Sequence, residues 1–70
     1  MELRNNAITL GELLDDPGAR AVLQRRFGTL LGHPMVRAAR SLTLEQLAQL
    51  AAVWLPRPVI QETLRELHRL

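Results

Sequence analysis

The stretch Leu42-Thr43-Leu44-Glu45-Gln46-Leu47 carries the clearest local folding signal in this 70-residue chain. Thr43 and the residue three positions later, Gln46, have the form of a capping box, in which each side chain accepts a hydrogen bond from the other residue's backbone N–H. Leu42 is placed to pack on Leu47 as a hydrophobic staple. The stretch therefore predicts a helix that begins at Leu44 and runs to about Trp54.

Apolar residues of this helix recur at spacings of three and four, which is the period of one helix face. They are Leu44, Leu47, Ala48, Ala51 and Trp54. Leu50 and Val53 widen the stripe, so we expect this helix to be central to the core. At that spacing Trp54 is expected to be a core residue rather than a platform for a ligand.

Towards the N-terminus, a second capping box of Thr9 and Glu12 predicts a short helix from about Leu10. The dipeptide Asp16-Pro17 ends that helix and starts the next, because proline disfavours helical geometry before it but suits a first helical position. We expect a helix over 17–27, terminated by Gly28, with Ala21, Val22, Leu23 and Phe27 facing inward. Residues 1–8 are expected to be extended or frayed.

Two further prolines mark helix starts. His33-Pro34 opens a shorter helix before Ser41, with His33 as a cap or packing residue, and Pro56 and Pro58 enforce a turn before a final helix over 59–70. In that last helix Ile60, Leu64 and Leu67 are predicted to face inward. Glu62 is expected to pair with Arg65, and Glu66 with Arg69, across one helical turn.

Composition agrees with an all-α fold. The chain is 47% hydrophobic, has 15 leucines, one Phe, one Trp and no Tyr, and is rich in the helix-favouring residues Ala, Leu, Arg, Glu and Gln. A chain of this length forms one small domain. We therefore predict a single domain over residues 1–70, folded as a compact orthogonal bundle of about five short helices.

Positive charge is carried by nine arginines with no lysine, against seven acids, for a net charge of +2. Residues 17–44 contain five arginines and no acid, so this band of the chain is cationic and could face an anionic partner. A solvated helix face is the alternative interpretation. The candidate anion-facing residues are Arg20, Arg25, Arg26, Arg37 and Arg40.

No pattern predicts catalysis, a cofactor or a metal site. The chain has no cysteine, its two histidines, His33 and His68, are far apart, and its four glycines lie in separate turns. The longest apolar run, residues 50–55, is far shorter than the about 20 residues that a transmembrane helix needs. We expect a protein that is not an enzyme and has no membrane partner. The cytoplasm is the favoured location.

Two functions remain. The first is a noncatalytic helical module that docks on a host enzyme or on a second copy of itself. Its predicted interaction surface consists of Leu30, Leu31, Met35, Val36, Leu50, Val53 and Trp54. The alternative is a helix-turn-helix nucleic-acid-binding domain over 43–67, although its turn is long and twice interrupted by proline, and the second helix has no arginine among residues 59–63.

Three stretches resemble a small helical segment at the end of some bacterial carbohydrate-active enzymes, such as glycoside hydrolases and esterases. They are ITLGELLDDPGARAVL (residues 8–23), LLGHPMV (30–36) and ARSLTLEQLA (39–48). The resemblance implies an appendage that packs on a larger enzyme or on another copy, with no catalytic residue to carry over. A second resemblance, through TLGELL (9–14) and TLEQ (43–46), is to helical domains that accompany iron–sulfur repair proteins, but those use a cysteine motif that is lacking here.

Overall fold

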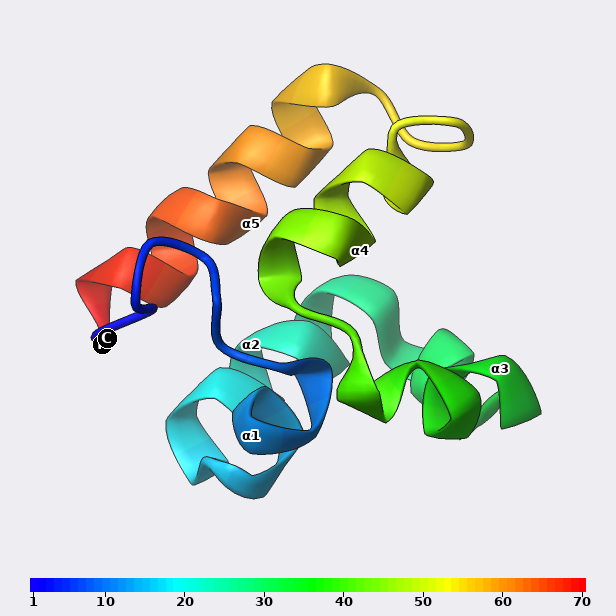
Figure 1. The fold of residues 1–70 in the computed structure, drawn as a ribbon, viewed down its shortest axis with the longest axis horizontal. Helices are drawn as coiled ribbons and strands as arrows, with labels where there is room; N and C mark the ends of the chain where they lie inside the picture. Colours follow the sequence, from blue (N-terminus) through cyan, green and yellow to red (C-terminus); the bar gives the residue numbers. More distant parts are fainter.

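The computed structural model describes all 70 residues and confirms the all-α prediction. Five α-helices and two short 3-10 helices follow one another without a β-strand (Figure 1). Their bounds are α1 Leu10–Asp15, α2 Pro17–Phe27, η1 Gly28–Gly32, α3 Pro34–Ala38, η2 Ala39–Ser41, α4 Leu44–Ala51 and α5 Arg57–Arg69.

The predicted helix starts are formed as expected. The Thr9 hydroxyl accepts a hydrogen bond from the Glu12 N–H at 3.2 Å, and the Thr43 hydroxyl accepts one from the Gln46 N–H at 3.2 Å. Both reciprocal bonds of the capping boxes are also present. Asp16 caps α2, and His33 Nδ1 caps α3 by accepting from the Met35 N–H at 3.1 Å. Local sequence signals therefore set where these four helices begin.

The N-terminal segment is part of the core and contains a turn, so the expectation that residues 1–8 are extended or frayed is wrong. Leu3 is fully buried and Ile8 nearly so. Between them, Arg4, Asn5 and Asn6 have positive φ angles, and the chain turns back on itself so that both apolar side chains point inward. Asparagine tolerates this left-handed backbone better than most residues. In Figure 1 this segment runs from the end of α5 to the start of α1.

The core is a cluster of nine buried apolar residues drawn from most of the elements. They are Leu3, Ile8, Leu10, Leu13, Ala19, Val22, Leu23, Leu44 and Leu67. Helix α2 contributes Val22 and Leu23 as predicted, but Ala19 takes the inward position expected of Ala21, which is exposed.

Helix α4 is not central to the core, contrary to the prediction. Only Leu44, its first residue, is buried, and the helix ends at Ala51 rather than Trp54. Beyond Ala51 the Val53 and Trp54 N–H groups donate to the carbonyls three residues earlier, those of Leu50 and Ala51, so the helix tightens into a turn before Pro56. Trp54 therefore loses its place in the helical stripe and is 76% exposed.

Helix α5 begins two residues earlier than expected, with Pro58 in its first turn. Leu67 is buried, whereas Ile60 and Leu64 are half-buried. Thr63 is buried as well, because its hydroxyl donates to the Val59 carbonyl at 2.7 Å and so satisfies its own polar group.

The predicted pairs within α5 do not form. Glu66 instead bridges to α2, where it pairs with Arg25 and accepts a hydrogen bond from Arg26 Nε at 2.6 Å. The face of α5 that carries Glu66 packs against α2. The carboxylate therefore pairs with Arg26 and Arg25, which lie 40 and 41 positions earlier in the chain, instead of with Arg69. No ion pair joins Glu62 to Arg65.

Candidate interaction surfaces

Five of the seven residues predicted to form an interaction surface are exposed. They are Leu30, Met35, Leu50, Val53 and Trp54. The other two, Leu31 and Val36, are half-buried and pack against the core cluster. Large apolar side chains scattered singly over a protein surface are ordinary. They indicate a binding site only where the surface between them is apolar as well.

An apolar groove lies among α2, η1, α4 and α5. Its volume is about 290 Å³, and 15 of its 16 lining residues are apolar. The lining consists of Leu10, Leu13, Leu23, Phe27, Leu30, Leu31, Val36, Leu44, Leu47, Ala48, Ala51, Leu55, Ile60, Thr63, Leu64 and Leu67. On the α4 side, Ala48 and Ala51 present only methyl groups, which do not reach far enough to fill the space. The core is thus open on one side.

The molecular surface is larger than its mass requires. The chain exposes 4908 Å². The scaling for compact monomers gives about 4,400 Å² for a protein of 7.9 kDa, so roughly 500 Å² of additional surface is exposed. An open groove beside exposed Leu50, Val53 and Trp54 has the character of a surface that binds another molecule.

The five arginines predicted as one anion-facing band separate into two groups. Arg25 and Arg26 both pair with Glu66, so their charges are partly neutralised. Arg20, Arg37 and Arg40 lie together around a different hollow. The spacing of the arginines along the chain could not show this division, because Glu66 comes from a distant helix.

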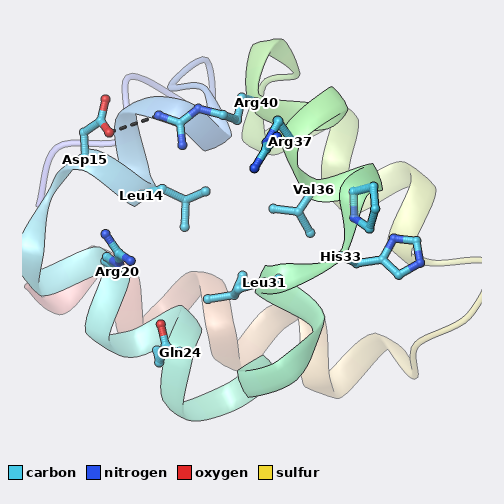
Figure 2. Close-up of a pocket in the computed structure, with 11 residues that line it drawn as sticks. Leu14, Asp15, Arg20, Gln24, Leu31, His33, Val36, Arg37 and Arg40 are labelled. Carbon is cyan, nitrogen blue, oxygen red and sulfur yellow. Dashed lines mark hydrogen bonds and ion pairs between the residues drawn. The ribbon is translucent and has the colours of Figure 1, made fainter.

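This second hollow, the cationic pocket, is drawn in Figure 2 and has a volume of about 360 Å³. Leu14, Leu31 and Val36 line its apolar part, and polar side chains surround them. Arg40 donates to Asp15 at 3.0 Å and lies 3.5 Å from the Gly11 carbonyl. Neither Arg20 nor Arg37 has a carboxylate partner.

The full lining of the cationic pocket is Leu14, Asp15, Arg20, Gln24, Leu31, Gly32, His33, Pro34, Val36, Arg37 and Arg40. Leu14, Asp15 and Gln24 were not predicted from the sequence to be site residues. Nothing in the local pattern marks them, since Asp15 meets its partner Arg40 across 25 positions of the chain.

The helix-turn-helix candidate is represented by α4, the turn over 52–56 and α5. Of the arginines in the band 17–44, none belongs to α4 or α5. The exposed side of α5 carries Arg57, Arg65 and Arg69 together with Glu62.

No protein-family model, curated protein or solved structure matches the chain. No helix has the length and apolar character to cross a membrane, the longest being α5 with 13 residues. No group of three His, Asp or Glu side chains comes together as metal ligands would.

Proposed function

We propose that this protein is a noncatalytic helical protein-interaction module that associates with a second copy of itself through the apolar groove. The observation that supports the proposal is a groove lined by 15 apolar residues and left open to solvent. Burial of apolar surface is the main favourable term in most protein association. A small domain also gains stability from such burial, because its own core is limited.

The choice of a second copy rests on the features beside the groove. Val53 and Trp54 protrude from the turn that follows α4, next to a groove that lacks side chains to fill it. A surface that carries both a protrusion and a hollow suits a two-fold symmetric dimer, in which each copy offers the same patch to the other.

Sedimentation equilibrium of the full chain from about 1 to 300 µM tests this proposal. We expect a reversible monomer–dimer equilibrium that is weakened in Leu30→Gln, at an exposed residue of the groove lining, and in Trp54→Gln, at the protrusion beside the groove. Leu70→Gln is the matched control, because Leu70 is also exposed but lies at the C-terminal end of α5, outside the groove lining and away from the turn that carries Trp54. A chain that stays monomeric over the whole range, or a dimer that both variants leave intact, would contradict self-association; the monomer would favour docking on a different protein, such as a host enzyme.

A helix-turn-helix function is the alternative, and the distribution of arginines gives it less support. DNA binding requires cations that neutralise phosphates around the recognition helix. In this chain Arg25 and Arg26 are engaged by Glu66, and Arg20, Arg37 and Arg40 line a pocket away from α5. Binding of a random-sequence DNA duplex at 20 mM salt, lost in Arg57→Gln and Arg65→Gln, would favour this alternative over the interaction module.

A further inference from the structure

We propose that the cationic pocket binds a small organic dianion with an apolar body, of which a phosphate monoester is the simplest example. The pocket lies on α1, α2, α3 and the two 3-10 helices, and it shares only Leu31 and Val36 with the apolar groove. This site is therefore distinct from the proposed dimer surface, and the proposal does not depend on self-association.

The charge of the pocket suits a dianion. Arg20, Arg37 and Arg40 bring three positive charges to the pocket, and Asp15 removes one of them, which leaves +2. A phosphate monoester at pH 7 carries about −1.5 to −2, so one such group balances the pocket. Guanidinium groups suit this task, because their planar N–H donors bind two oxygens of a phosphate or carboxylate at once.

Two of the pocket arginines have no partner in the fold. Arg20 and Arg37 make no ion pair and no side-chain hydrogen bond; Arg57, Arg65 and Arg69 are also unpaired, but they lie on α5, outside the pocket. Arg20 and Arg37 come from different helices, α2 and α3, and line the same pocket (Figure 2). Like charges brought to one pocket repel each other unless an anion joins them.

The pocket also has an apolar side, which suits the part of the ligand that carries no charge. Leu14, Leu31 and Val36 are half-buried and form an apolar lining, against which a ring or a short alkyl chain can pack (Figure 2). A volume of about 360 Å³ lies at the small end of the about 300–1,000 Å³ that is typical of small-molecule sites. Gln24 adds an amide that can both donate and accept a hydrogen bond.

The opposite effects of two kinds of substitution make the proposal testable. Replacing Arg20 or Arg37 with glutamine removes a charged donor, and we expect each change to weaken binding about tenfold. Asp15→Asn frees Arg40 from its carboxylate partner and removes a negative charge, so it should strengthen binding several-fold. All three side chains belong to exposed residues, so the variants are expected to fold.

The experiment is a titration of the full chain, followed by amide chemical shifts in NMR, with three probes. We expect phenyl phosphate to bind more tightly than inorganic phosphate, and phenol, which lacks the charge, to bind least. Arg65→Gln and Glu45→Gln are the charge-matched controls; they lie outside the pocket and should leave binding unchanged.

Three results would overturn the proposal. If phenol binds as tightly as phenyl phosphate, the charge of the ligand does not contribute to binding and the site is merely apolar. Equal effects of Arg37→Gln and Arg65→Gln would mean that only net charge matters. Shifts centred on Ala48 and Ala51 instead of Gln24 and Arg37 would place the ligand in the apolar groove.

Discussion

Thr9 and Thr43, the N-caps of α1 and α4, face each other across an isolated antiparallel bridge. The Leu10 N–H donates to the Leu42 carbonyl at 2.9 Å, and the Leu44 N–H donates to the Ile8 carbonyl at 2.8 Å. Two helix starts that lie 34 positions apart are thereby joined. The first N–H group of each helix, which has no acceptor within its own helix, donates to a carbonyl just before the other helix. This junction connects the N-terminal segment, α1 and α4.

Loss of either cap is expected to destabilise the protein measurably. Thr9→Ala and Thr43→Ala should each lower the free energy of unfolding by about 1 kcal/mol, because each leaves a first-turn N–H without its acceptor. Because the caps are neighbours, the double variant should lose less than the sum, since fraying caused by the first change already weakens the second cap. Urea denaturation measures all three. Thr29→Ala, at an exposed threonine of η1, should be nearly neutral, and strict additivity would show that the bridge does not couple the caps.

Leu3 provides the sharpest test of the buried N-terminal segment. Its side chain is fully buried, so Leu3→Ala should cost about 2–5 kcal/mol. That is a large fraction of the about 3.5–10 kcal/mol expected for a domain of this size. Thermal unfolding followed by circular dichroism measures the loss, with Leu70→Ala as an exposed control. A cost for Leu3→Ala as small as that of the control would mean that the segment is frayed after all.

Helix starts could be predicted from the sequence because capping is local. Thr43 and Gln46, or Asp16 and Pro17, specify a helix start within four residues, and both signals are confirmed. Partners across the fold could not be predicted in this way. The pairing of Thr9 with Thr43, the meeting of Glu66 with Arg26, and the burial of Leu3 all depend on how distant segments pack.

The same limit explains the error at Trp54 and the partial success at the candidate sites. A periodic stripe predicted Trp54 inside, but the chain leaves the helix after Ala51, and periodicity has no meaning beyond that residue. The arginine band was visible in the sequence, but its division by Glu66 and the apolar lining from Leu14 were not. The sequence therefore predicted the kinds of residue at the apolar groove and the cationic pocket. Which of them lie together depends on the fold.

Glu66 joins α5 to α2 through its ion pairs with Arg25 and Arg26, and its removal should have a modest effect. Glu66→Gln is expected to lower the free energy of unfolding by about 0.5–1 kcal/mol, because the ion pairs with Arg25 and Arg26 are only partly shielded from water. The loss should shrink in 1 M salt, where exposed charges are screened. Urea denaturation at both salt concentrations checks this, and Glu62→Gln, whose residue lies on the same helix without a partner, should cost almost nothing. An equal cost for both variants would contradict the bridge.

A larger side chain inside the apolar groove should stabilise the monomer and weaken its self-association. Ala51 lines the groove at the end of α4, and leucine is nearly as good a helix former as alanine, so Ala51→Leu adds apolar volume where space exists. We expect it to raise the free energy of unfolding by about 0.5–2 kcal/mol and to weaken the monomer–dimer equilibrium at the same time. Ala52→Leu, at the exposed neighbouring position outside the groove, adds the same atoms and should do neither. Urea denaturation at low concentration and sedimentation equilibrium at high concentration measure the two effects. If Ala51→Leu destabilised the monomer, the groove would be too narrow for a leucine side chain, and a space that rejects this chain's own leucine would not accept the side chain of a second copy.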